Sequence, residues 1–127
     1  NIKNIFQYFF GIDINTINLY PNEYTFLLMY ILEKTTEFDK WLKRLKDFRA
    51  KAKILFRLQK IEDDEHFGDC ESVGYGIREL RIDYAKGYRV YFKELDGKII
   101  FLLIGGDKST QQKDIEKAKY ILSKIKK

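Results

Sequence analysis

Between residues 79 and 92, apolar and polar side chains alternate in a way that predicts two half-buried strands. In the first, residues 79–83, Leu80 and Ile82 alternate with charged residues. A period of two places these apolar side chains on one face of a sheet and the charged ones on the other. Residues 88–92 repeat the pattern, and their inward side chains are Tyr88, Val90 and Phe92.

Residues 85–87, an Ala-Lys-Gly sequence, fit a three-residue hairpin loop whose glycine takes the left-handed conformation. This loop length pairs Arg81 with Tyr91, and Asp83 with Arg89. Both arginines and the tyrosine are therefore expected on the face of the sheet that points away from the core.

Two amphipathic helices are predicted before these strands. In the first, Thr36 is placed to cap the helix with Asp39 in the capping-box position, and apolar residues recur at intervals of three and four from Phe38. The second helix covers about residues 49–65, and its expected inward side chains are Ile54, Leu55, Leu58 and Ile61. A short turn joins the two, so they form a helical hairpin with its basic residues outward.

Further elements flank this region. Residues 30–35 are expected to form a short strand, and the apolar run at residues 98–104, after a turn at residues 96–97, is typical of a central strand. Ser109 and Gln112 make a second capping box, which starts a last helix. That helix is expected to bury Ile115, Ala118, Leu122 and Ile125.

The order of these elements, β-α-α-β-β-β-α, predicts an α+β fold. The N-terminal helical hairpin packs on one face of a small, mostly antiparallel sheet, and a C-terminal helix follows the last strand. The other face of the sheet is expected to stay partly open.

The charges of the chain are unevenly placed. There are 24 Lys and Arg against 19 Asp and Glu. Residues 40–60 contain nine basic residues and one acid, whereas residues 61–71 contain six acids and no Lys or Arg. Such a segregated basic surface favours an anionic partner, either nucleic acid or an acidic protein. A solvated helix face with no partner is the alternative.

The single cysteine, Cys70, excludes a disulfide framework within the chain and is typical of a reducing compartment. No apolar run approaches the roughly 18 residues that a membrane span requires, and no Cys/His spacing is typical of a metal site. We therefore expect no membrane association, no metal and no small-molecule cofactor.

Residues 1–28 differ in composition from the rest, with five Asn, seven aromatic residues and only three charged residues. They lack the basic start and small-residue cleavage site of a secretory signal. The sequence does not begin with Met, whereas Met29 directly precedes the regular pattern. We therefore predict a domain at residues 29–127 after an N-terminal extension at residues 1–28. An added strand or an apolar helix in this segment is the alternative.

Three cations, Arg81, Arg89 and Lys108, are placed so that they could converge on the open face of the sheet. Metal-independent RNA cleavage uses the 2′-OH as an internal nucleophile, and the enzyme aligns the attack, stabilises the phosphate charge and moves two protons. Arginine forks match phosphate oxygens, and Lys108 precedes a helix start, which favours anions. Gly105 and Gly106 would let an anion approach the backbone. The cluster therefore favours RNA phosphate chemistry.

Each cation also has a structural interpretation. Arg89 could form a cross-strand salt bridge with Asp83, Arg81 could be a solvated strand residue, and Lys108 could belong to an ordinary strand-to-helix turn. The glycine-rich turn is not a P-loop, because Asp107 stands where the pattern GxxxxGK[ST] requires glycine. Nucleotide hydrolysis is excluded on that ground.

Three motifs together resemble a known family: Glu-Leu-Arg-Ile from residue 79, Gly-Tyr-Arg-Val-Tyr-Phe from residue 87 and Leu-Ile-Gly-Gly-Asp-Lys-Ser-Thr-Gln from residue 103. They resemble the HigB-type branch of the RelE/ParE toxin superfamily, the addiction-module killer proteins, over about residues 29–127. The resemblance implies a type II toxin of the bacterial cytoplasm. Such toxins typically enter the ribosomal A site and cut mRNA. A cognate antitoxin, usually a helix-turn-helix protein encoded alongside, holds them inactive.

The resemblance also implies roles for particular residues. Arg89 matches the arginine that contacts the scissile phosphate in RelE-like enzymes, and Arg81 falls where these enzymes carry a functional basic residue on the neighbouring strand. The chain departs from the family in having no tyrosine at residues 111–115, the start of the last helix, and its single histidine, His66, lies in the acidic stretch. The residue that transfers protons therefore stays open among Asp107, Asp114 and Glu79.

Further residues are candidates for substrate binding. Tyr91 could stack on a base, which is worth ~1–3 kcal/mol, or it could simply cover Arg81. Three basic residues of the predicted helical hairpin could dock on ribosomal RNA or receive an acidic segment of the antitoxin. We name them the hairpin cations: Lys43, Arg44 and Lys51.

Two other functions stay open. The chain could be a non-nuclease inhibitor of the same fold, like the ParE poisons of DNA gyrase, or a degenerate toxin that only binds an antitoxin. The cationic cluster favours the nuclease, because a gyrase-binding toxin has no need of a phosphate site.

Overall fold

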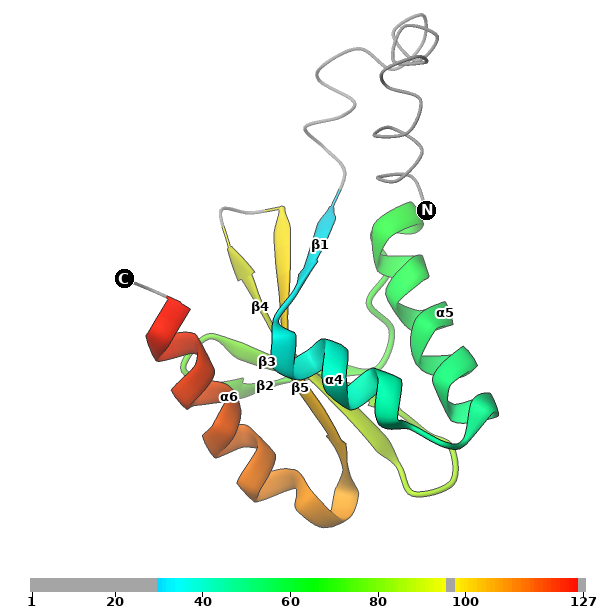
Figure 1. Cartoon of the computed structure of the whole chain (residues 1–127). Helices are drawn as coiled ribbons and strands as arrows, with labels where there is room; N and C mark the ends of the chain where they lie inside the picture. Colours follow the sequence, from blue (N-terminus) through cyan, green and yellow to red (C-terminus); the bar gives the residue numbers. More distant parts are fainter. Residues whose placement is uncertain (1–29, 96–97, 126–127) are drawn as a thin grey trace, which may run out of the picture.

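The computed structural model of the chain describes residues 30–95 and 98–125 (Figure 1). In chain order, the described elements are β1 (Ile31–Lys34), α4 (Thr36–Arg44), α5 (Phe48–Asp64), β2 (Cys70–Gly74), β3 (Ile77–Ile82), β4 (Tyr88–Leu95), β5 (Ile99–Asp107), the 3₁₀ turn η1 (Lys108–Thr110) and α6 (Gln111–Ile125). The predicted extension at residues 1–28 and the predicted turn at residues 96–97 lie outside the described residues.

Within the described residues, five strands form one sheet in the order β1-β5-β4-β3-β2. β1 runs parallel to β5, and the other neighbouring strands are antiparallel. β5 lies inside the sheet, which explains why its apolar run shows no alternation. The predicted α+β fold, with a helical hairpin before the sheet and a C-terminal helix after it, is confirmed.

The edge strand β2 is an element that the sequence pattern does not predict. Its sequence, Cys-Glu-Ser-Val-Gly, contains no apolar alternation, and most of its side chains are exposed. It pairs with β3 through the backbone, with Cys70 opposite Leu80 and Glu71 opposite Glu79. An edge strand needs a partner on one side only, and it can form with little apolar burial.

Two apolar clusters hold the helices to opposite faces of the sheet. On one face, α4 and α5 bury Phe38, Ile54 and Leu58 against side chains of β3 and β4 such as Leu80 and Val90. On the other, α6 packs Ala118, Ile121 and Leu122 against Tyr91, Leu103 and Ile104. Figure 1 shows α5 and α6 well apart, with α4 crossing between them. α6 packs mainly on β5 and β4, so the expected open face is covered there.

The helix starts differ by a residue or two from the predicted caps. Thr35, not Thr36, caps α4: its hydroxyl accepts the Phe38 N–H at 2.9 Å and donates to the Leu103 carbonyl at 2.8 Å. This second bond ties the start of α4 to β5 and decides which threonine becomes the cap. At the last helix, the capping box is formed by Asp107 and Thr110 rather than by Ser109 and Gln112.

The inward face of α5 is narrower than predicted. Its buried apolar side chains are Ala50, Ile54, Leu58 and Ile61. The prediction that Leu55 points inward is wrong, since this side chain is 45% exposed. One residue advances a helix by about 100°, so Leu55 is turned well away from its buried neighbour Ile54.

The register of the β3–β4 hairpin differs from the prediction by two residues. Arg81 lies opposite Arg89, and Glu79 opposite Tyr91. The strands end earlier than predicted and are joined by residues 83–87, a five-residue loop. Its glycine, residue 87, has the predicted left-handed conformation with a φ of 75°. The arginines therefore lie side by side on one face of the sheet.

Candidate functional site

The candidate site lies where β3 and β5 end and β4 begins, on the face that α6 covers. Arg89 is opposite Arg81 on one side and opposite Gly106 on the other, so these three residues share a face. Lys108 follows β5 directly. The structure thus brings the ends of three strands together around Arg89.

Arg89 and Lys108 meet at Gly87. The Lys108 backbone N–H donates to the Gly87 carbonyl at 3.0 Å, and Arg89 Nη1 donates to the same oxygen at 3.1 Å. A Cβ on residue 87 would lie 3.0 Å from Lys108 Cδ and 3.5 Å from Arg89 Nη1. Two cationic side chains thus pass close to one glycine. The convergence of their charged groups on a ligand stays a prediction.

Glu79 is a fully buried carboxylate at the centre of the site. It accepts hydrogen bonds from Gln111 Nε2 at 2.7 Å, the Tyr91 hydroxyl at 2.9 Å and Arg81 Nε at 3.1 Å. Arg89 Nε, which is buried, lies 3.5 Å away. Burial alone would raise the pKa of Glu79, but the hydrogen bonds from Gln111, Arg81 and Tyr91 outweigh it and hold this pKa below its usual value. Glu79 is therefore a negative charge that joins β3, β4 and α6.

This arrangement changes the interpretation of two predicted site residues. Glu79 has a lowered pKa and oxygens already engaged by donors, so it is poorly suited to transfer protons. The prediction that Tyr91 faces outward is wrong, because its ring is fully buried. Burial and the hydrogen bond to Glu79 raise the pKa of Tyr91 far above its usual value. A ring buried beneath α6 has no face on which a base could stack.

Arg81 is surrounded by acids. Besides Glu79, it pairs with Glu71, and its Nη1 lies 3.9 Å from Asp69. These carboxylates offset its charge and join β3 to β2. The Arg81 side chain is 30% exposed and that of Arg89 12%, so the two arginines differ in the number of their acid partners more than in access to solvent. Arg89 also has a different acid partner from the predicted one: it contacts Glu79 rather than Asp83.

Among the candidate proton-transfer residues, Asp107 and Asp114 have different surroundings. Asp107 caps η1 by accepting the Ser109 N–H at 2.8 Å and the Ser109 hydroxyl at 2.6 Å. Asp114 accepts a hydrogen bond from the Thr110 hydroxyl. Burial raises the pKa of Asp114; the Thr110 bond opposes this and the charge of Asp107 adds to it. A raised pKa brings a carboxyl closer to the range useful for proton transfer.

The two glycines before Asp107 serve packing. A Cβ on Gly105 would lie 2.3 Å from the Trp41 ring, and one on Gly106 would lie 1.8 Å from Asp114 Oδ2. The expectation that they leave room for an anion is therefore wrong, because side chains of α4 and α6 fill that space. This contact also places Asp114 over Gly106, the cross-strand neighbour of Arg89.

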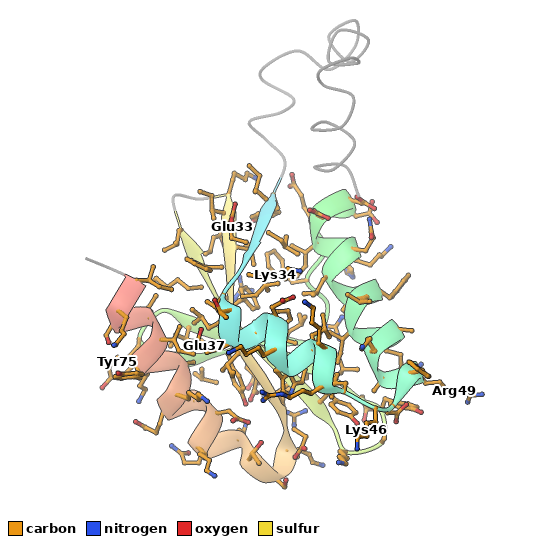
Figure 2. The ribbon with its side chains drawn as sticks, viewed as in Figure 1. Glu33, Lys34, Glu37, Lys46, Arg49 and Tyr75 are labelled. Atoms are coloured by element: carbon orange, nitrogen blue, oxygen red, sulfur yellow. The ribbon has the colours of Figure 1, made fainter. Side chains whose placement is uncertain are left out.

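The hairpin cations lie on α4 and α5. Lys43 is exposed and pairs with Asp39 at 3.2 Å. Arg44 lines a cleft of about 420 Å³ between α4 and α6, together with Trp41, Asp114, Lys40 and Lys117. Figure 2 shows the nearby Lys46 and Arg49, around the turn between the helices, extending away from the body of the molecule. Glu37 also lines this cleft. Since Asp114 belongs to both regions, the cleft borders the candidate site.

The sequence pattern did not predict two residues of the site. Gln111 donates to Glu79, and Trp41 packs over Gly105. A glutamine at a helix start carries no signal of its own, and Trp41 matched the inward stripe of a helix. His66 is exposed just after α5.

Residues 30–95 and 98–125 offer neither a metal site nor a membrane span. No group of three or more His, Cys, Asp or Glu side chains in that part of the chain could hold a metal ion. No helix there is long and apolar enough to cross a membrane.

Comparison with protein families and with individual proteins gives two sequence relationships. Residues 40–124 match the family described as phage derived protein Gp49-like (DUF891). The chain is also 50% identical over 94 residues to an uncharacterized protein of Haemophilus influenzae. That alignment covers 74% of this chain and 94% of the relative.

Three solved structures with a similar fold are a toxin and two toxin–antitoxin complexes. A mutant of the Escherichia coli toxin RelE in the free state matches with a TM-score of 0.58 at 17% identity, covering 74% of this chain and 99% of RelE. The intact E. coli RelBE toxin–antitoxin complex matches with a TM-score of 0.52 at 16% identity, over 61% of this chain and 95% of the matched one. A RelBE complex of Mycobacterium tuberculosis gives 0.50 at 17% identity, over 64% and 100%.

Proposed function

We propose that this chain is the toxin of a toxin–antitoxin system and that it cleaves mRNA on the ribosome. The chain belongs to the phage derived protein Gp49-like family and to the RelE/ParE-like toxin superfamily. The observation that carries the nuclease assignment is the meeting of Arg89 and Lys108 at Gly87. Two cationic side chains that pass the same glycine could both reach one phosphate.

In the proposed reaction, the 2′-OH of a ribose attacks the adjacent phosphate and the 5′-oxygen of the next nucleotide leaves. Arg89 and Lys108 stabilise the negative charge that grows on the phosphate oxygens. Such preorganised charges are typically worth ~10²–10³ in rate each. Arg89 is held by the carbonyls of residues 87 and 88 and by the charge of Glu79, so little of this arrangement has to form during the reaction.

Proton transfer falls to Asp114 in this proposal. It is half-buried, its pKa is raised, and it lies over the neighbour of Arg89. As a carboxylate it would accept the 2′-OH proton, and the leaving 5′-oxygen would take up a proton from solvent water to become a 5′-OH. Asp107 is held as a helix cap and Glu79 as a structural anion, so both are less suitable.

The partners follow from the same proposal. The ribosome and mRNA are the targets in the bacterial cytoplasm, with the hairpin cations docking on ribosomal RNA. Two solved structures of this fold are complexes with an antitoxin, which supports a cognate antitoxin, of helix-turn-helix type by the sequence resemblance.

The test is a short pulse of expression in bacteria without an antitoxin, followed by mapping of transcript 5′ ends. We expect growth arrest and new 5′ ends inside translated frames. Lys108→Ala should remove the new ends, whereas Lys86→Ala, an exposed lysine in the adjacent hairpin loop, should not. Intact mRNA together with inhibited gyrase would contradict the nuclease, and normal growth with abundant folded protein would contradict the toxin itself.

A further inference from the structure

The outer face of α5 carries large apolar side chains that are exposed among the described residues. Phe48 is 79% exposed, Phe56 61% and Leu55 45%. With Ala52, which is also exposed, they recur along the helix at intervals of four, three and one. We name this set the outer stripe: Phe48, Ala52, Leu55 and Phe56. Single exposed apolar residues need no explanation, but a contiguous stripe on one helix is typical of an interaction surface.

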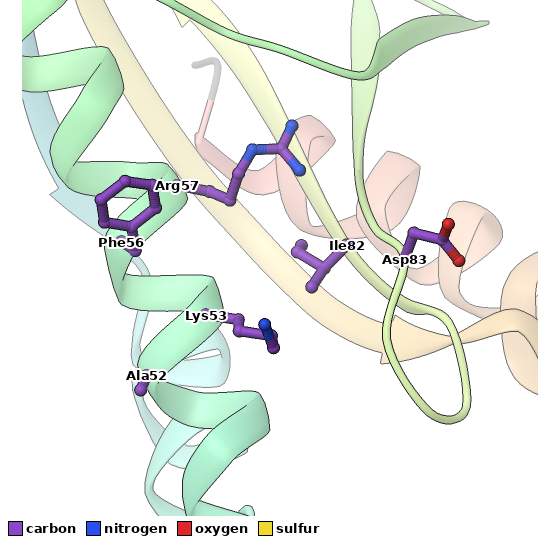
Figure 3. A pocket seen from close by; sticks show the side chains of 6 residues that line it. All are labelled: Ala52, Lys53, Phe56, Arg57, Ile82 and Asp83. Carbon is purple, nitrogen blue, oxygen red and sulfur yellow. The ribbon is translucent and has the colours of Figure 1, made fainter.

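A groove borders the outer stripe. It has a volume of about 520 Å³ and lies between α5 and the end of β3, lined by Ala52, Lys53, Phe56, Arg57, Ile82 and Asp83. Figure 3 shows Lys53 and Arg57 reaching from α5 toward Ile82 and Asp83. Arg57 donates to the Phe67 and Asp69 carbonyls at 2.8 and 3.0 Å. These bonds fix the wall of the groove in place.

The rim of the stripe is basic. Arg49, Lys53 and Lys60 follow one side of it at helical spacing, and Lys60 Nζ lies 5.9 Å from the centre of the Phe56 ring. Lys51 borders the other side, one turn from Leu55. An apolar stripe between basic borders complements an amphipathic helix whose apolar face is flanked by Asp and Glu.

We propose that the outer stripe and its groove bind an acidic amphipathic helix of the antitoxin. The inference rests on the proposed function for the identity of the partner, and on the stripe and its charges for the surface. A second copy of this chain fits poorly, because a two-fold contact would place the basic border against itself. RNA fits poorly too, since phosphates would contact the lysines and leave Phe48 and Leu55 in water.

The experiment measures binding of the purified full-length chain to the purified protein encoded by the adjacent gene, by titration calorimetry. The test variant is Phe48→Ser/Phe56→Ser, and the matched control is Tyr120→Ser, an aromatic residue 60% exposed on α6. We expect the dissociation constant to rise by about 30-fold or more in the test variant, as for buried aromatic hot spots, and by less than about 2-fold in the control. A melting curve for each variant verifies folding.

A charge variant keeps the proposal testable if the double variant misfolds. Lys53→Glu should weaken binding about 10-fold at low salt, and the difference should shrink as salt rises. Equal binding by all variants, equal loss in the control, or no binding by the wild type would overturn the proposal. The proposal would also be overturned if the wild type forms a dimer that only the double variant disrupts, or if the double variant loses ribosome binding and keeps its binding to the partner protein. Binding by the wild type that appears only after residues 1–29 are removed would overturn it as well. Growth arrest is scored separately, so a failed toxin assay leaves the binding result readable.

Discussion

Replacing Glu79 by glutamine tests whether this carboxylate holds the site together. The substitution keeps the size of the side chain and removes its charge. In the wild type, Glu79 accepts three side-chain hydrogen bonds and lies 3.5 Å from the buried Nε of Arg89. The variant would leave Arg89 without a nearby anion and would set the N–H₂ group of the introduced amide against existing donors.

The expected loss of stability is large. Removing one partner of a buried ion pair typically lowers the free energy of unfolding by about 3–5 kcal/mol. We expect the lower end, about 3 kcal/mol, because Arg81 is partly exposed and keeps Glu71 and Asp69 as partners. For a domain of this size, that corresponds to a melting temperature roughly 10–20 °C lower. The control is Glu71→Gln, which removes an exposed carboxylate that also pairs with Arg81 and should leave the melting temperature nearly unchanged.

The pH dependence separates the charge from the shape of Glu79. Its pKa in the folded protein lies below the ordinary value of 4.5, so its contribution is fully present above that value and is lost as the pH falls through the folded pKa. The difference in unfolding free energy between wild type and Glu79→Gln should therefore be full at pH 7 and shrink below about pH 4.5. Denaturant unfolding at pH 7 and near pH 3.5 measures it. A variant as stable as the wild type at pH 7, or a deficit unchanged in acid, would refute the reasoning.

Four further predictions follow from the site and the surface. Arg89→Lys keeps the charge but loses the guanidinium fork, and we expect cleavage in a ribosome assay to fall by ~10²–10³ with a smaller loss of stability than in Arg89→Ala. Asp114→Asn should slow cleavage yet raise the melting temperature at neutral pH, because the raised pKa of Asp114 means that its ionised form destabilises the fold there. Reversing the charges of the hairpin cations should reduce ribosome co-sedimentation more than Arg89→Ala does, with a steep salt dependence for the wild type; binding insensitive to both would refute the docking role. Deleting residues 1–28 should lower the melting temperature by less than about 5 °C, roughly 1 kcal/mol, and preserve toxicity, if the domain begins near residue 29.

The alternation of side chains predicted the core better than it predicted the site. Leu80, Val90 and Phe92 face the helical hairpin as the period of two requires. The same period assigned Glu79 and Tyr91 to a solvated face, and both are fully buried. A period distinguishes two faces of a strand, but it does not tell whether the polar face meets water or a helix. Here the buried tyrosine hydroxyl and carboxylate satisfy each other, which lets α6 cover them.

The hairpin register was mispredicted for a related reason. A loop of three residues and a loop of five both place a glycine at the left-handed position before β4, so the sequence alone does not choose between them. In the structure, Ala85 has a positive φ of 50° as well as Gly87, and the longer loop shifts the register by two. A shift of two keeps every side chain on its face. The prediction that Arg81 and Arg89 share a face therefore survived, while their predicted neighbours did not.

The three cations of the site are anchored in different ways, and we therefore assign them different roles. Arg81 is anchored by carboxylates, which offset its charge, so its contribution is to bind β2 and β3 together. Lys108 is positioned by its own backbone N–H on the Gly87 carbonyl, and its exposed side chain is left to contact a ligand. Arg89 lies between these extremes: two carbonyl oxygens accept hydrogen bonds from its Nη1, and its Nε lies 3.5 Å from the Glu79 carboxylate. Arg89 has one acid neighbour and Arg81 has three. A cation with fewer acid neighbours keeps more of its field for a phosphate, which is why the proposed phosphate site comprises Arg89 and Lys108 and leaves Arg81 as their support.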